Sequence, residues 1–306
     1  MLLSVMSLLL WVAGAFVSSP VKCSYIDGFL LSSVGEYGCR ALSLLLYVAV
    51  ALISGAFVIV EERTPWLAGL FLLISSFLFP LQENVAVAAS TLLLMVAVAF
   101  LLSCYPQEAV ERRIYTVFFI YSLSVLMVPQ FIYLAPLFIL YPIMTGVLGI
   151  KSLLSLFLGV LTPFWLLYGF TWVFPSLSVA RIPFEQGLQL ISFASGNDAS
   201  QPQLLFIFAE LFIMLPAAFL FFTTSIPAKP LMRKMLAFFM LANLYMWLLQ
   251  WVFRGDSLLL LAWRLPGLAI MAAYMFTVRI TKLSNIYFVL IFITWLIVAA
   301  LGIWNG

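Results

Sequence analysis

Two charged residues lie alone within long apolar stretches, and they are the residues of this sequence best placed to do chemistry. Glu210 is the single charged residue of residues 204–223, and Arg264 is the single charged residue of residues 257–278. A charge inside the hydrocarbon of a bilayer costs roughly 2.5–3.5 kcal/mol on insertion scales, so such a residue normally has a partner. A guanidinium binds a carboxylate or a phosphate through two hydrogen bonds. The two residues therefore predict either an ion pair or an anion site.

The depths of the two residues in their stretches match. Glu210 lies about 9 Å from the start of its stretch and Arg264 about 10 Å from the start of its own, at 1.5 Å per helical residue. Gln250 and Asp256 are expected on the same side of the membrane, so the predicted substrate-binding set is Glu210, Arg264, Gln250 and Asp256. Two other interpretations remain: an ion pair that only locks two helices, or an Arg264 side chain that reaches the membrane interface.

Asp27 is the predicted catalytic residue. It follows the first apolar stretch, and its carboxylate could act as a general base if a substrate hydroxyl lay beside it. The alternative is a solvated turn residue before Gly28. Cys23 and Cys39 predict either a disulfide or two thiols. The sequence has no histidine and no paired cysteine motif, so we expect no metal site and no cofactor.

Composition places the chain in a membrane. Hydrophobic residues make up 66% and charged residues 8% of its 306 residues, against roughly 45–50% and 25% in soluble domains. Mean hydropathy is +1.21. The net charge of +3 is spread thinly, so we expect no nucleic-acid partner. One integral membrane domain over residues 1–306 is the simplest organisation.

The apolar stretches predict an all-α, polytopic bundle of transmembrane helices with about eleven spans. The first stretch could instead be a signal peptide, and the fifth and sixth, hinged at Pro129, could be one broken or re-entrant pair. In the long segment 175–203, Phe184, Leu188 and Ile191 share one helical face and predict a helix in the membrane interface. The expected spans are residues 2–17, 41–60, 66–79, 85–103, 114–128, 131–148, 153–174, 204–223, 235–253, 257–278 and 286–304.

Basic residues predict the orientation of these spans. Nine lysines and arginines lie in loops after even-numbered spans and four in loops after odd-numbered spans. Because basic loops stay in the cytoplasm, the N-terminus is expected there. Residues 18–40 and 175–203 are then loops on the outer side, and Glu210 and Arg264 lie in the outer half of the membrane.

A family resemblance rests on residues 64–175. They contain the segments FLFPLQENVAVAASTLLLM, YPQEAVERRIYT, LMVPQFIYLAPLFILYP and GVLTPFWLLYGFTWVF. This stretch resembles a family of uncharacterised polytopic inner-membrane proteins of outer-membrane-bearing bacteria, which has no established activity or catalytic residues. The resemblance implies localisation in the bacterial inner membrane.

The layout is also similar to that of integral-membrane glycosyltransferases that use polyprenyl-phosphate sugars. The similarity implies that Asp27 is the acidic residue of the first outer loop, and that residues 184–191 are the interfacial helix. The sequence differs from that family in lacking an acidic doublet, because Ile26 and Gly28 flank Asp27. We therefore expect a protein that handles a lipid-linked or envelope substrate at the outer leaflet, with membrane lipid, including a polyprenyl-phosphate carrier, as its partner. A transporter or flippase and a non-catalytic assembly subunit are the alternatives.

Overall fold

A computed structural model describes residues 25–56, 85–104, 109–173, 201–223, 230–252, 257–278 and eight positions between 286 and 297. Over these residues the secondary structure is helical, and no strand occurs among them, which confirms the all-α prediction for this part of the chain. The elements are α2 (Tyr25–Ala56), α5 (Val85–Leu102), α6 (Val110–Met127), η1 (Pro129–Leu134), α7 (Ala135–Thr145), α8 (Ile150–Val173), α10 (Gln201–Thr223), α11 (Pro230–Val252) and α12 (Ser257–Val278).

The chain divides into two compact units. The first contains Lys22–Leu46 and Asn84–Phe193, and the second contains Met1–Val21, Tyr47–Glu83 and Ala194–Gly306. Helix α2 contributes to both units, α5 to α8 belong to the first, and α10 to α12 belong to the second. That the whole chain forms one membrane domain stays a prediction.

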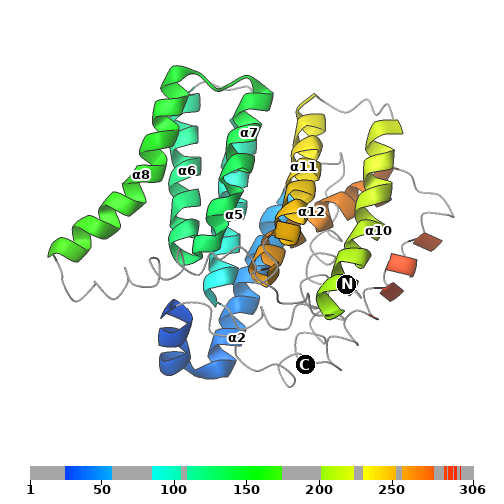
Figure 1. Ribbon diagram of the computed structural model, residues 1–306, viewed down its shortest axis with the longest axis horizontal. Helices are drawn as coiled ribbons and strands as arrows, with labels where there is room; N and C mark the ends of the chain where they lie inside the picture. The colour runs from blue at the N-terminus through cyan, green and yellow to red at the C-terminus, as the bar shows by residue number, and fades with distance from the viewer. Residues whose placement is uncertain are drawn as a thin grey trace. The chain divides into compact units, whose positions relative to one another are not determined.

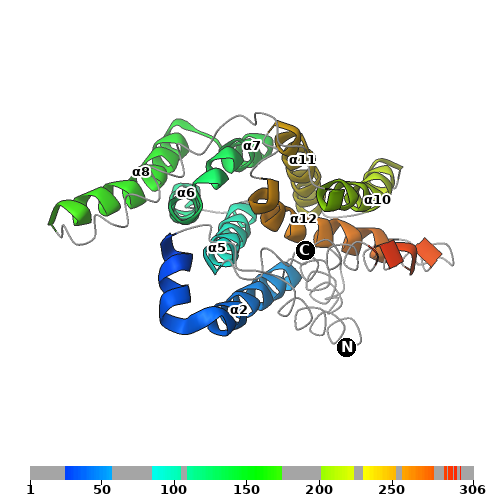
Figure 2. The ribbon, with the colours of Figure 1, turned by 60° about the horizontal axis from the view of Figure 1, so that its bottom comes forward.

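In the first unit, α6 lies between α5 and α8 (Figures 1 and 2). Its buried residues Ile114, Val117, Phe118, Tyr121 and Val125 recur at the spacing of one helical face. At Gly159 of α8, an added Cβ would lie 2.6 Å from the backbone oxygen of Tyr115 in α6. Glycine therefore permits the close approach of α6 and α8, as small residues do between membrane helices.

The proline-rich stretch after α6 breaks the helix where the sequence predicts a hinge. Helix α6 ends at Met127, and Pro129 begins the 3-10 helix η1. The Tyr121 hydroxyl donates to the backbone oxygens of Phe131 at 2.9 Å and Ile132 at 3.1 Å, which fixes η1 against α6. Helix α7 is only 11 residues long and ends at Thr145, and the next residue, Gly146, has a φ of 72° that favours glycine.

In the second unit, α12 packs against both α10 and α11. The described residues between 286 and 297 are helical, and the Tyr287 hydroxyl donates to the backbone oxygen of Phe212 in α10. This unit contains both of the charged residues singled out from the sequence, Glu210 in α10 and Arg264 in α12.

Several predicted boundaries agree with the structure and others need correction. Helix α12 has the predicted bounds, and α5 ends one residue early. The predicted loop at residues 18–40 is wrong where the structure describes it, because α2 is helical from Tyr25 onward. The span expected from residue 235 begins earlier in the structure, because α11 starts at Pro230, a helical position that needs no N–H donor. Helix α7 begins at Ala135, with Pro136 in its first turn and Pro142 inside it.

Two described helices are long and apolar enough to cross a membrane, Val85–Leu102 and Ile150–Phe170. The first is 67% buried, as the core helix of a soluble protein would also be, whereas the second is only 11% buried. Its exposed residues include Phe157, Trp165 and Phe170. Helix α8 therefore presents most of an apolar surface outward, which lipid tolerates and water does not.

Candidate functional site in the second unit

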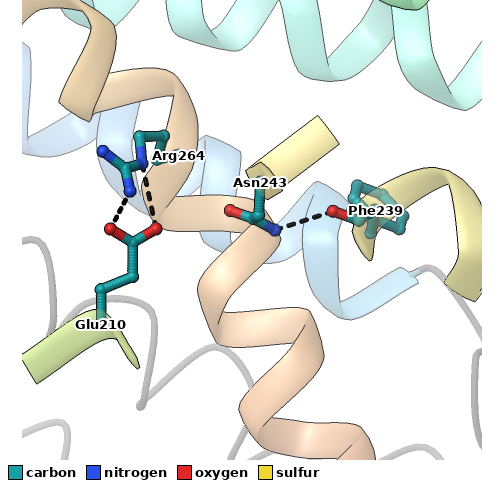
Figure 3. Close-up of polar contacts among 4 residues, drawn as sticks. All are labelled: Glu210, Phe239, Asn243 and Arg264. Carbon is teal, nitrogen blue, oxygen red and sulfur yellow. Dashed lines mark hydrogen bonds and ion pairs between the residues drawn. The ribbon is translucent and has the colours of Figure 1, made fainter. Parts of the chain in front are cut away.

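Glu210 and Arg264 form a buried, two-pronged ion pair between α10 and α12 (Figure 3). Arg264 Nε donates to Glu210 Oε1 at 3.0 Å, and Arg264 Nη2 donates to Glu210 Oε2. Each residue is 1% exposed. The predicted contact between the two residues is thus confirmed, and both carboxylate oxygens are engaged. Such bidentate, charge-assisted bonds are about twice as strong as neutral ones.

Helix α10 turns its charge inward and its large apolar side chains outward. Glu210, Ile213 and Ala217 are buried and lie on one helical face. On the opposite side, Leu215 and Phe219 are each 66% exposed and Phe222 is 78% exposed. A helix in water has the reverse pattern. The arrangement is the one expected of a helix that faces lipid and carries a charge toward the bundle interior.

Helix α12 positions Arg264 within its most buried stretch. The described side chains of residues 263–272 are all buried. Pro266 lies two residues after Arg264 and has no N–H, so the backbone oxygen of residue 262 lacks its usual helical donor.

A third polar side chain, Asn243 of α11, faces α12 from the other side. It is 2% exposed, and its Nδ2 donates to the backbone oxygen of Phe239 at 2.9 Å (Figure 3). Its Oδ1 has no hydrogen-bond donor among the described residues. A buried acceptor without a hydrogen bond costs about 1–3 kcal/mol. The burial of this oxygen without a donor in the described ranges is therefore unfavourable unless another group binds it.

Asn243 lies directly against a glycine of α12. A Cβ added to Gly267 would lie 2.6 Å from Asn243 Nδ2 and 3.1 Å from Oδ1. Any side chain at position 267 would therefore press on the amide. Glycine at this position allows α11 and α12 to approach and brings the amide within one helical turn of Arg264.

Of the other predicted site residues, some lie in described helices and some lie outside the described residues. Asp27 lies in the first turn of α2, so its prediction as a loop residue is wrong. Gln250 lies in α11. Asp256, Cys23 and the predicted interfacial helix at residues 184–191 lie outside the described residues. Cys39 is buried in α2.

Sequence reasoning identified the ion pair and missed the contact between Asn243 and Gly267. Asn243 is the one amide in the middle of an apolar stretch, and glycine follows proline at 266 and 267. These two features of the sequence indicate a polar position at 243 and a closely packed position at 267. The sequence does not indicate that the two residues are in contact, because only the packing of α11 on α12 brings them together.

The described residues contain no group of three or more His, Cys, Asp or Glu side chains that could hold a metal ion. The site consists of the Arg264 guanidinium, the Glu210 carboxylate that binds it, and a neighbouring acceptor that has no donor within the described ranges.

No protein-family model matches the chain, and no curated protein or solved structure shows significant similarity to it.

Proposed function

We propose that the chain is an integral inner-membrane protein that binds a phosphate-bearing, lipid-linked or envelope substrate at the Glu210–Arg264 pair. The observation that carries the proposal is the distribution of charge and apolar surface on α10. Glu210 is buried against Arg264 while Leu215, Phe219 and Phe222 are exposed. In lipid, a buried charge pair marks a functional site by default, and the exposed apolar side chains contact hydrocarbon.

Binding would proceed by exchange at the guanidinium. Glu210 occupies both prongs of the Arg264 fork in the structure. A phosphate presents oxygens with the same spacing as a carboxylate, so it can take the place of Glu210 on the fork. The carboxylate then has to find another donor or take up a proton, because a lone buried charge is costly. Substrate binding is thereby coupled to the charge state of Glu210.

The finer topology belongs to the same proposal. About eleven spans, with the N-terminus in the cytoplasm, would place the pair in the outer half of the membrane. Two described helices meet the length and hydropathy of a full span, and three shorter apolar helices, Gly38–Ile53, Pro129–Thr145 and Glu210–Thr223, are consistent with it. The exposed face of α8 supports contact with lipid.

Transport or flipping of the substrate is the second candidate, and the internal prolines favour it. Pro163, Pro216 and Pro266 lie inside α8, α10 and α12. Proline removes a helical hydrogen bond, and interrupted helices often line a substrate path in transporters. The enzymatic version is sugar transfer from a polyprenyl carrier with Asp27 as base. Asp27→Asn should abolish transfer and leave transport intact.

The test of the binding site compares polyprenyl phosphate with polyprenol, which has the same chain without the phosphate. Affinity for purified protein in detergent would be measured by native mass spectrometry. We expect wild-type protein to prefer the phosphate. Glu210→Gln should bind polyprenyl phosphate roughly 10- to 100-fold more tightly, because the Glu210 carboxylate no longer competes with the phosphate for Arg264. The expected gain corresponds to the free energy of one charge-assisted hydrogen bond. Arg264→Gln should lose the preference.

The double variant Glu210→Gln/Arg264→Gln is the control, because it leaves no unpaired charge. It should fold and show no preference for the phosphate. If Glu210→Gln bound the phosphate no better than wild-type protein did, the ion pair would be only a structural link between α10 and α12, and the proposed function would fall.

A further inference from the structure

We propose that Asn243 supplies a hydrogen-bond acceptor to the ligand of the Glu210–Arg264 pair. The site would then select a phosphodiester lipid whose headgroup carries a hydroxyl group close to the phosphate. This inference rests on the proposed function and adds to it the chemistry of the headgroup. It assigns to Asn243 a role in specificity that neither the ion pair nor the helix packing requires.

The first observation is the unused oxygen of a fully buried amide. Asn243 is 2% exposed, its Nδ2 is bonded to the backbone oxygen of Phe239, and its Oδ1 has no donor among the residues described. The opposite orientation of the amide would set Oδ1 against that backbone oxygen, and two acceptors would repel. The acceptor that lacks a donor in the described part of the chain is therefore Oδ1.

The second observation is the position of this oxygen relative to Arg264. Gly267 follows Arg264 by three residues in α12, and residues at that spacing are neighbours on one side of a helix. Asn243 packs directly on Gly267. In Figure 3, Asn243 turns Nδ2 toward Phe239 and Oδ1 toward the side on which Glu210 and Arg264 lie. A group bound to the guanidinium would have its substituents near this acceptor.

The chemistry of the acceptor then limits the ligand. An ionised phosphodiester has no donor of its own, so it cannot satisfy Oδ1. A hydroxyl of a sugar or of glycerol, one or two carbons from the phosphate, can donate to it. Both headgroups share the required chemistry, a phosphodiester with a nearby hydroxyl, and they differ in the lipid that carries them.

The experiment uses two lipids of equal charge. Dioleoyl-phosphatidylmethanol and dioleoyl-phosphatidylglycerol have the same chains and the same phosphodiester, and only the second carries hydroxyls. Their apparent dissociation constants would be measured for the full chain in detergent by native mass spectrometry. We expect wild-type protein to bind phosphatidylglycerol roughly 3- to 10-fold more tightly, the worth of one neutral hydrogen bond to a buried acceptor.

Asn243→Leu should bring the ratio of the two apparent dissociation constants to about one. Asn243→Ser should retain part of the preference for phosphatidylglycerol, because a serine hydroxyl can donate to the backbone oxygen of Phe239 and still accept a bond from the ligand. If Asn243→Leu does not fold, Asn243→Ser still tests the inference. Ser124→Ala is the matched control, since Ser124 Oγ is another buried oxygen without a partner among the described residues, in the other unit.

The inference about Asn243 would be overturned if the preference for phosphatidylglycerol persisted in Asn243→Leu or were absent in wild-type protein. If both lipids still bound in an Arg264-dependent manner, the proposed function would stand. Binding of neither lipid in an Arg264-dependent manner would overturn both. A third probe, polyprenyl-phosphoryl-glucose, distinguishes the source of the hydroxyl. If it binds more tightly than phosphatidylglycerol and depends on Asn243, the ligand is a lipid-linked sugar. If it binds more weakly, the ligand is a bulk phospholipid.

Discussion

Glu210 and Arg264 stabilise each other in a place where either charge alone would be costly. Their side chains have no access to solvent that could screen them, being 1% exposed. Breaking a buried pair by removing one partner typically costs about 3–5 kcal/mol, whereas removing both costs much less. The energy of the pair therefore belongs to the two residues jointly and not to either one.

We predict that Glu210→Gln and Arg264→Gln each lower the free energy of unfolding by about 3–5 kcal/mol. The double variant should lose clearly less than the sum of the two single losses. Unfolding by SDS titration in mixed micelles measures all three variants. Simple additivity would show that the two residues do not interact in the protein. Arg264→Lys should recover only part of the stability, because an ammonium cannot form both bonds of the fork.

Cys104 predicts a pH dependence at the end of α5, outside the apolar helix. Its side chain is 3% exposed, and its Sγ donates to the backbone oxygen of Phe100 at 3.3 Å. Burial raises the pKa of the thiol from 9.0 to about 11, and the positive charge of Arg113 opposes this rise. In the unfolded chain the thiol ionises near its ordinary pKa, so above it the unfolded state binds fewer protons than the folded state.

The contribution of Cys104 to stability should therefore be constant below about pH 9 and should fall between pH 9 and pH 11. Other groups titrate in this range, so the measurement is the difference in free energy of unfolding between wild-type protein and Cys104→Ala across it. A difference that does not change with pH would contradict the prediction. Thiolate-specific alkylation of the folded protein should be slow at pH 8 for the same reason.

At the scale of helices, α6 and α8 pack closely at a glycine of α8. A substitution of this glycine tests whether the two helices pack as the structure shows. Gly159 meets the Tyr115 backbone oxygen and the Phe118 Cβ, which would lie 2.6 and 3.0 Å from an added Cβ. The Tyr115 hydroxyl also donates to Thr162 Oγ1 at 3.3 Å across the same interface. A backbone atom cannot move aside as a flexible side chain can, so the helices themselves would have to separate.

We predict that Gly159→Ala lowers the free energy of unfolding by roughly 1–3 kcal/mol, the usual cost of overpacking. Gly169 in the same helix is the matched control, because an added Cβ there meets nothing within 4 Å. Gly169→Ala should raise stability by up to about 1 kcal/mol through helix propensity. Effects of the same sign in the two variants would show that α8 does not pack on α6 at Gly159.

At the scale of the whole molecule, the orientation of the chain decides whether the ion pair can meet an outer-leaflet substrate. The proposed topology sets residue 27 and residue 197 outside and Arg112 in the cytoplasm. Arg112 is exposed at the start of α6, where it can contact lipid headgroups. Basic residues near span ends remain on the cytoplasmic side.

We predict that single cysteines at positions 27 and 197 react with a membrane-impermeant maleimide in intact cells, and that a cysteine at position 112 does not. The background lacks the three native cysteines. Labelling after permeabilisation is the control, and it should reach all three positions. The inverted pattern would place the acidic segments in the cytoplasm. It would eliminate the polyprenyl-sugar proposal and leave a transporter or an assembly subunit.

The sequence by itself determined the all-helical class of the described residues, the bounds of some helices and the charged residues that they carry. Hydropathy is a property of consecutive residues, so it located α12 at its observed bounds and α5 within one residue. The cost of a lone charge in an apolar helix is equally local, and it led to the hypothesis that Glu210 and Arg264 pair or share a ligand. Polar composition misled at residues 25–40, where helical hydrogen bonds continue through a segment that contains charged residues.

Only the tertiary structure decided which faces meet. Three features depend on residues from different helices: the contact of Asn243 with Gly267, the packing of Gly159 against α6, and the outward apolar face of α8. The same holds for η1, whose backbone oxygens are satisfied by Tyr121 of α6. Such contacts follow from the shapes that pack together, and a periodic apolar pattern is compatible with many packings. That the Asn243 Oδ1 atom has no donor in the described part of the chain could therefore be recognised only once its surroundings were known.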